Sequence, residues 1–487
     1  MEIIRPTLGV SADDLGPCER VGEPRHFHTA RAIMQLMKGD LRRRVLWGFA
    51  ILAIVCICGF GSFGYYAYQA TFGKAARSLP NEIALARKEG IPLDPDDLRP
   101  KPPIPDEENA ATIYLAFFPR IDRAFREHRK LLDECNDLAK YKASGAEARD
   151  IRLAIGEIHE SLEEIAAGSK RPFCDFHYRY EDGPDLKMPE MATAKNAARL
   201  LDASATFLAR QGKVSEAYDE IAAAIAVGRQ IGKGPYLIAC LVQLAIDGMA
   251  VQELCDLIDL SKSDPALLAK AQKTLDGAGP IADLRSSFGS EVVMGRVAIH
   301  RVHTFSDLRA ISSASGGDDD SDNSLNGGGP KLPPSLTQAF EARYLATWRE
   351  AFEKLPADPT DWLDAYHVLK PIDARVDSDR SLENTMNAIL FPSLENVALA
   401  IGHQDANRRI AACAVRLMQD RLRTGSLPAT LPDYGKISID PFDGKPLRYR
   451  REGAGFTLYS IDRDFKDDGG RPWRVNGDGG DLVREFK

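Results

Sequence analysis

Val45 to Tyr68 is an apolar stretch of 24 residues without one charged side chain. A helix of this length rises about 36 Å, enough to cross the roughly 30 Å hydrocarbon core of a bilayer. Trp47 lies near one end and Tyr65 and Tyr66 near the other, at the depths where membrane interfaces favour aromatic rings. The pattern predicts one transmembrane helix over residues 45–68.

Other interpretations of this run fit less well. A cleaved signal peptide has a short leader and an apolar core of about 7–15 residues, whereas here a segment of 44 residues comes first. A lipoprotein signal needs small residues before its cysteine, and Ile54 and Val55 precede Cys56. A buried helix of a soluble domain remains an alternative, although it is rarely this long and free of charge.

Cations flank the run on one side. Lys38 and residues 42–44, which are all arginine, precede it closely, whereas Lys74 alone follows it closely. The positive-inside rule predicts that residues 1–44 form a cytoplasmic tail and that the rest of the chain lies outside the cytoplasm. We therefore expect a single-pass protein of a bacterial inner membrane. Residues 29–44 could also form an amphipathic helix on membrane lipid.

The remainder of the chain has the apolar periodicity of helices. Residues 69–105 form a juxtamembrane and proline-rich connection, residues 106–310 a helical ectodomain, and residues 336–424 its continuation. Residues 311–335, which contain the DDDSD and GGGP runs, lack an apolar period and predict a disordered linker. The segment 381–423 predicts two helices, divided after Gly402.

Two helical stretches in the ectodomain carry further alternatives. Residues 191–210 and 214–231, joined by a glycine turn, predict an αα-hairpin similar to one tetratricopeptide-type repeat, but no second copy follows. Residues 234–260 are apolar enough for a second membrane span. Asp247 would be costly in a bilayer, so a core helix of the ectodomain fits better.

The pattern changes in residues 425–487, which predict a small β-hairpin module with an acidic loop. Residues 447–451 alternate apolar and charged positions, Gly453 and Gly455 mark a turn, and residues 456–461 form the partner strand. Aspartates and glycines then alternate as far as Asp481. The fold class is therefore mainly α, with this β-hairpin at its end.

The module resembles the C-terminal part of the major pseudopilins of type II secretion. The matching residues are Asp440-Pro441, Tyr449, Tyr459-Ser460, Asp464 and Asp481-Leu482. Phe465 stands where those proteins have glycine, and residues 45–68 lack the prepilin processing motif, so only the module is similar. The whole layout, with its PIPDEENAA segment and YS…DDGG tail, resembles a class of uncharacterised bacterial membrane-anchored proteins.

The resemblance implies a structural calcium site in the acidic loop. Calcium takes six to eight oxygens from carboxylates and carbonyls on a bendable loop. We expect Asp464 and Asp481 as ligands, Ser460 through its carbonyl group, and Asp462 or Asp468 as a further oxygen donor. The alternative is a solvated acidic tail without metal, neutralised by the arginines and lysine within it.

Composition narrows the function classes. The net charge of −8 and the pI near 5.7 argue against a nucleic-acid partner. Cys135 and Cys174 could form a disulfide outside the cytoplasm. His300 and His303 share a helix face, but an exposed polar face is the simpler interpretation. No GxSxG, HExxH or P-loop motif occurs.

These observations favour a non-catalytic, membrane-anchored scaffold that binds a protein partner in the cell envelope. The alternative is an envelope hydrolase without a recognisable local motif. An apolar or open groove along the helices would favour the scaffold. A cleft with paired carboxylates of shifted pKa would favour the enzyme.

Overall fold

The computed structural model describes residues 72–133, 145–281, 283–314, 330–358, 360–473 and 479–487. The predicted transmembrane helix and cytoplasmic tail lie outside the described residues, as do Cys135 and residues 315–329 of the predicted linker. The described residues from Phe72 to Lys487 form one compact unit.

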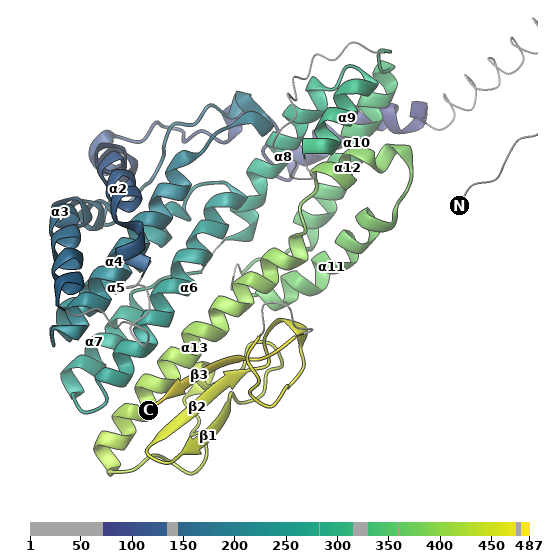
Figure 1. The fold of residues 1–487 in the computed structure, drawn as a ribbon. Helices are drawn as coiled ribbons and strands as arrows, with labels where there is room; N and C mark the ends of the chain where they lie inside the picture. The colour runs from purple at the N-terminus through teal and green to yellow at the C-terminus, as the bar shows by residue number, and fades with distance from the viewer. Residues whose placement is uncertain (1–71, 134–144, 282, 315–329, 359, 474–478) are drawn as a thin grey trace, which may run out of the picture. The chain divides into compact units, whose positions relative to one another are not determined.

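This unit is mainly helical, with a small antiparallel sheet at the C-terminus (Figure 1). A first helix covers residues 72–88. The later helices are α2 (Ala110–Asp133), α3 (Ala146–Gly168), α4 (Pro189–Arg210), α5 (Val214–Ile231), α6 (Leu237–Leu260), α7 (Pro265–Asp276), α8 (Leu284–Arg301), α9 (Phe305–Ala314), α10 (Pro334–Lys354), α11 (Trp362–Ser378), α12 (Thr385–Leu390) and α13 (Leu394–Thr424).

The predicted αα-hairpin is present as α4 and α5. Its turn lies at Gly212, whose φ of +80° is in the left-handed region that glycine adopts without strain. Helix α6 then packs on both members of the hairpin, and α13 packs on α6 (Figure 1). The core of the unit is therefore a row of helices with α6 inside it.

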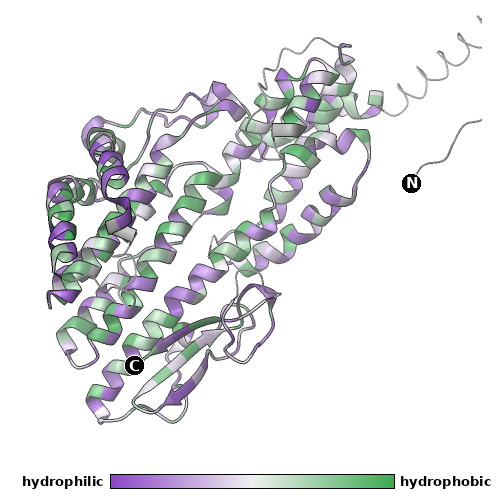
Figure 2. Cartoon of the chain, in the orientation of Figure 1, coloured by the Kyte–Doolittle hydropathy of each residue, from purple (hydrophilic) through white to green (hydrophobic). Residues whose placement is uncertain are grey.

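Helix α6 is apolar over most of its length, as Figure 2 shows. Among the described helices it alone is long and apolar enough to cross a membrane by length and composition, but most of its side chains are buried within the fold. Its surroundings are α4, α5, α7, α8, α13 and the last strand. A helix that is hydrophobic on nearly all sides needs such neighbours. In this structure α6 is accordingly a core helix, as the interpretation of residues 234–260 as part of the ectodomain core expects.

Asp247, the charge inside α6, is paired. Its carboxylate is fully buried and accepts a hydrogen bond of 2.6 Å from the guanidinium group of Arg408 on α13. Burial raises the pKa of Asp247 to about 6, although the cation of Arg408 opposes that rise. Arg408 also donates to the carbonyl oxygen of Gly279. The pair therefore links α6 to α13, the longest of the described helices.

Helix α13 differs from the prediction for residues 381–423. It is continuous through Gly402, and the break comes earlier, between Leu390 and Leu394, where Pro392 interrupts the helix. Gly402 instead allows a close approach: a Cβ atom there would lie 2.5 Å from the indole ring of Trp362 on α11. The predicted division after Gly402 was thus wrong because the glycine serves packing between helices.

The C-terminal module contains three strands, β1 (Arg448–Glu452), β2 (Gly455–Ser460) and β3 (Leu482–Phe486), in the order β1-β2-β3. The predicted hairpin is confirmed as β1 and β2, and β3 is an addition that the sequence did not predict. All six residues of β2 are buried between their neighbours and α13. The end of β3 is attached to α6, because the backbone N–H of Lys487 donates to Asp259.

One hydrophobic core joins these parts. It contains residues from the segments on both sides of the predicted linker, such as Phe288 and Trp348, and residues of the sheet, such as Phe456 and Leu458. Helix α9 extends to Ala314, past the predicted start of the linker. Residues 106–310, 336–424 and 425–487 therefore share their apolar interior within the part that the structure describes.

We predict how loss of the buried Asp247–Arg408 pair changes the free energy of unfolding. Asp247→Ala should lower the free energy of unfolding by about 3–5 kcal/mol, because it leaves a buried guanidinium group without its anion. Changing both residues, Asp247→Leu with Arg408→Met, should cost clearly less than the sum of the single changes. Chemical denaturation of the full chain measures both effects. Glu160→Ala, which breaks the exposed pair with Arg120, is the control and should cost about 1 kcal/mol or less.

The pH dependence of the same pair has a defined sign. The folded-state pKa of Asp247 lies above the model value of 3.8, so the folded protein binds this proton more tightly than the unfolded chain. The contribution of Asp247 to stability is therefore fully present below about pH 3.8 and declines as the pH rises to about 6. The variant Asp247→Asn should lose this component. An unchanged pH profile in that variant would contradict the assignment.

Candidate functional site

The residues predicted to bind calcium are distributed over two places in the C-terminal module. Ser460 ends β2, and its fully buried hydroxyl group donates to Asp440 at 2.8 Å. Asp440 also accepts the backbone N–H of Ile461 at 3.0 Å and pairs with Arg448. Burial raises the pKa of Asp440. The aspartate of the Asp440-Pro441 turn is therefore a buried anchor for the end of β2.

Asp462 faces the helices. Its buried carboxylate lies 2.9 Å and 3.0 Å, through its two oxygens, from Nδ1 of His403 on α13. Its φ of +55° is left-handed, a conformation that aspartate tolerates better than most residues. Asp462 thus joins the module to α13, and the structure does not bring it together with Asp464 as a pair of ligands.

Phe465, at the position of the pseudopilin glycine, is also left-handed, with a φ of +58°. A large side chain pays a conformational cost there. Its ring stacks on Tyr366 at 5.3 Å between ring centroids and contacts Phe442 edge-on at 5.5 Å. These contacts offset the cost, so the backbone keeps the conformation that glycine would favour while the side chain attaches the loop to α11.

Asp464 and Asp468 both lie beside Gly479. A Cβ atom on Gly479 would be 2.1 Å from Oδ2 of Asp464 and 3.7 Å from Oδ2 of Asp468. Oδ2 of Asp464 is buried and has no hydrogen-bond donor among the described residues, while its Oδ1 accepts the backbone N–H of Lys466 at 3.0 Å. The loop therefore holds a buried carboxylate oxygen without a partner next to a second carboxylate.

Asp481 closes the loop. Its two carboxylate oxygens accept the backbone N–H groups of Asp468 at 3.2 Å and Gly470 at 2.6 Å. Burial, and then the charges of Asp467 and Asp468, raise the pKa of Asp481. Within the described residues, no three His, Cys, Asp or Glu side chains have ligand geometry for a metal. The orphaned oxygen of Asp464 nevertheless suits a cation.

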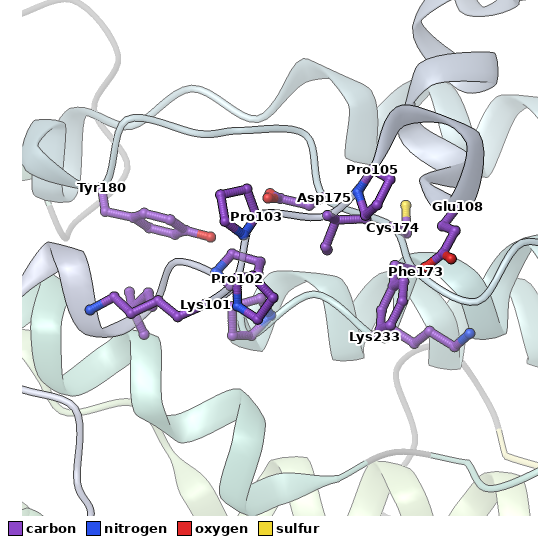
Figure 3. A pocket seen from close by; sticks show the side chains of 14 residues that line it. Lys101, Pro102, Pro103, Pro105, Glu108, Phe173, Cys174, Asp175, Tyr180 and Lys233 are labelled. Carbon is purple, nitrogen blue, oxygen red and sulfur yellow. The ribbon is translucent and has the colours of Figure 1, made fainter.

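A second feature is a cavity of about 750 Å³, which we call the proline-walled cavity. Its walls come from three separate segments: the strap, defined as residues 98–105, the stretch 173–180, and Lys233 with Pro235 (Figure 3). Most lining side chains are apolar. The volume is within the range of roughly 300–1,000 Å³ that small-molecule sites occupy.

The strap is attached by arginines near its two ends and by an ion pair of 2.9 Å between Lys101 and Asp96. Near its start the guanidinium group of Arg99 pairs with Glu181 and lies 6.0 Å from the ring centre of Tyr180. Just beyond its other end, Arg171 donates to the carbonyl oxygens of Asp106 and Asn109 at 2.7 Å and 2.8 Å. Within the described part of the chain, no backbone group of residues 99–104 forms a hydrogen bond.

Aromatic and polar groups complete this cavity. Tyr180 is the last ring of a row that also contains Tyr236, and the two hydroxyl groups lie 2.8 Å apart. The ring of Phe173 is 44% exposed, an unusual degree for a side chain of its size. Cys174 is a free thiol in the described structure, and burial raises its pKa to about 12, which favours the protonated thiol at neutral pH.

A third feature is an open cavity of about 680 Å³ between α3, α4 and α5, which we call the α3–α5 groove. Its floor contains Ile155 and Phe207, both buried. Acidic side chains gather on the walls: Glu163, Glu216, Asp219 and Glu220. The guanidinium group of Arg152 lies over the ring of Phe207, 5.9 Å from its centre.

One carboxyl group in this groove is perturbed. Glu220 accepts a hydrogen bond of 3.2 Å from the hydroxyl group of Ser204. Burial raises the pKa of Glu220, and the charge of Glu163 adds to the rise, whereas His159 opposes it. His159 is 3.3 Å from Glu163. The groove therefore combines a half-buried acid with a second carboxylate and an imidazole.

His300 and His303, the less favoured alternative of a metal pair, do not share a helix face, because α8 ends at Arg301. Nε2 of His300 lies 2.9 Å from the carboxylate of Glu341 on α10, and His303 follows the end of α8, where its backbone N–H donates to Asp307. Sequence reasoning missed both cavities and the buried contacts of Asp440 with Ser460 and Arg448. The aromatic stretch at 173–180 and the prolines of the strap were visible signals, but neither indicates a cavity by itself.

A comparison of this chain with protein-family models, with curated proteins and with solved structures finds no match. The functional conclusion therefore depends on the geometry of these sites.

Proposed function

We propose that this protein is a membrane-anchored, non-catalytic scaffold of a bacterial inner membrane, with a cytoplasmic N-terminus and an ectodomain that binds a protein partner. The observation that supports the proposal is the α3–α5 groove, which is open, runs between three helices and has an apolar floor. Grooves of this kind accept extended or helical peptide segments.

The groove also indicates the charge of the partner. Four carboxylates line it, and two cations lie among them, of which Lys213 is already paired with Glu216 at 3.1 Å. A segment with basic side chains would complement this lining, since opposite charge favours encounter and register. In this proposal α3 and the α4–α5 hairpin act together as a tetratricopeptide-like binding surface.

Site-specific crosslinking tests the groove. A photoreactive benzoylphenylalanine at Gly156 should crosslink a partner protein in intact membranes, because a Cβ atom there meets nothing within 4 Å. Glu163→Lys with Glu216→Lys should reduce the crosslinked product about tenfold, as expected for a loss of about 1.4 kcal/mol in binding. The readout is gel mobility followed by mass spectrometry.

Matched controls come from the same helix. The photoreactive residue at Leu153, which is 60% exposed outside the groove, should give no such product. Glu160→Lys, also outside the groove, should leave the product from Gly156 unchanged. Equal crosslinking from both positions, or indifference to the charge reversal, would refute the groove as the partner site.

We further propose a structural calcium ion in the acidic loop, held by Asp464 and Asp468 beside Gly479, with Asp481 closing the loop and Ser460 ending the adjacent strand. The buried, unpartnered oxygen of Asp464 supports this proposal. Burial raises the pKa of Asp481, the charges of Asp467 and Asp468 add to the rise, and a cation there would offset their repulsion. Asp462 is committed to His403 and is left out of the ligand set.

Thermal melting of the full chain with calcium and with chelator tests the ion. At a hundredfold excess of calcium over its dissociation constant, stabilisation should be about 2.7 kcal/mol. Asp464→Asn should abolish the shift in melting temperature, whereas Asp377→Asn, on the exposed side of α11, should preserve it. Identical melting temperatures with calcium and with chelator, together with no heat of calcium binding, would refute the calcium site. The loop would then be a solvated acidic tail without metal.

An envelope hydrolase is the second candidate, and Glu220 is the observation that favours it. A half-buried carboxyl group of raised pKa beside another carboxylate is suited to donate a proton. If the groove is catalytic, the full chain should cleave peptidoglycan sacculi or fluorescent casein, and Glu220→Gln should abolish cleavage without changing the melting temperature. Glu157→Gln on α3 is the control. Absence of cleavage of both substrates would remove this candidate.

A further inference from the structure

We propose that the proline-walled cavity binds an amphipathic anion: an aliphatic chain lies along the strap and Phe173, and a single carboxylate or phosphate head contacts Lys233. This site is separate from the groove and from the acidic loop, so it does not depend on the proposed scaffold function. Three independent observations support the proposal: the apolar wall, the cation without a carboxylate partner in the described structure, and the strap.

The apolar wall calls for an apolar ligand. Four prolines of the strap, Leu98, Ile104 and Phe173 line a space of about 750 Å³, and Figure 3 shows Pro102 and Pro103 between Tyr180 and Phe173. The 44% exposure of Phe173 is surface that a ligand would remove from water. Burying apolar area is worth about 25 cal/mol per Å², so an aliphatic chain gains from this wall.

The cation in the lining indicates that the ligand is negatively charged. Lys233 lines the cavity and donates to the carbonyl oxygen of Pro172 at 2.7 Å, but it has no carboxylate partner among the described residues. Partial burial, and then the charge of Arg229, lower the pKa of Lys233, so the environment disfavours its positive charge. An anion at this position would favour the protonated, positively charged form of Lys233.

The other charged groups of the lining do not compete for a cationic ligand. Asp175 accepts the backbone N–H of His177 at 2.9 Å and lies 3.1 Å from its imidazole Nδ1. Lys101 is paired with Asp96 at 2.9 Å. Glu108 is exposed to solvent. Lys233, although exposed, is thus the cation of the lining that has no carboxylate partner among the described residues.

The strap provides an adjustable wall. Because the backbone of residues 99–104 forms no hydrogen bonds within the described part of the chain, this wall can shift without breaking any. Arg99 at one end and Arg171 beyond the other hold it in place.

Photolabelling of the full chain in phosphatidylcholine nanodiscs tests the site. The probe is dodecanoate with a diazirine on its chain. We expect labelled peptides to contain residues 98–105 or 173–175, and unlabelled dodecanoate should compete whereas dodecyltrimethylammonium should not. Lys233→Gln should raise the half-saturating probe concentration about tenfold, which corresponds to about 1.4 kcal/mol. Phe173→Ser should also weaken labelling, because it removes the apolar contact with the aliphatic chain of the probe.

Controls separate binding from structure and identify the source of the anion. Lys187→Gln, at another exposed lysine, should label like the parent, and all variants should melt at the parent temperature. Loss of labelling in phosphatidylglycerol nanodiscs would assign the site to an anionic lipid, and unchanged labelling to a free fatty acid; both support the proposed chemistry. Labelling elsewhere, equal competition by the cationic detergent, or an unaffected Lys233→Gln variant would overturn it.

Discussion

The fold depends on the need to surround α6. A helix with apolar residues on nearly every side has no face to present to water, so it must be enclosed by other elements. Here the enclosure is made by helices from before and after it in the chain and by the edge of the sheet. This requirement explains why elements as distant in sequence as α4 and β3 belong to one core.

Enclosure creates a problem for the polar residues of α6, and the solution is pairing. Asp247 meets Arg408, and Gln243 donates to the carbonyl oxygen of Pro280 at 3.1 Å. Burying an unpaired charge is far more costly than burying a paired one. The contact of Asp247 joins α6 to α13, whereas that of Gln243 joins α6 to the segment before α8.

Local signals in the sequence predicted the elements whose causes are local. The α4–α5 hairpin and the β1–β2 hairpin each follow from periodicity and a glycine turn. Strand β3 was missed because residues 482–486 are short and charged, and they become a strand only by pairing with β2. The break of α13 was misplaced because Gly402 looks like a helix end, whereas its role is contact with Trp362.

The sites show the same division. Asp464 and Asp481 were predictable candidates because acidic residues and glycines alternate in one stretch, but the partner of Asp462 was not, since His403 lies on a distant helix. The two cavities are formed by segments far apart in the chain, and local patterns carry no information about the space between such segments.

A small-molecule site needs a wall that can vary to suit its ligand and a fold that stays stable, and in the strap different residues meet these two needs. Its ends are fastened by Arg99 and Arg171, while its middle neither enters a helix nor joins a sheet. Substitutions between residues 100 and 104 can therefore alter the size and polarity of the cavity at little cost to folding. In evolution or in protein engineering, this short segment is where the selectivity of the protein could diverge while its architecture stays constant.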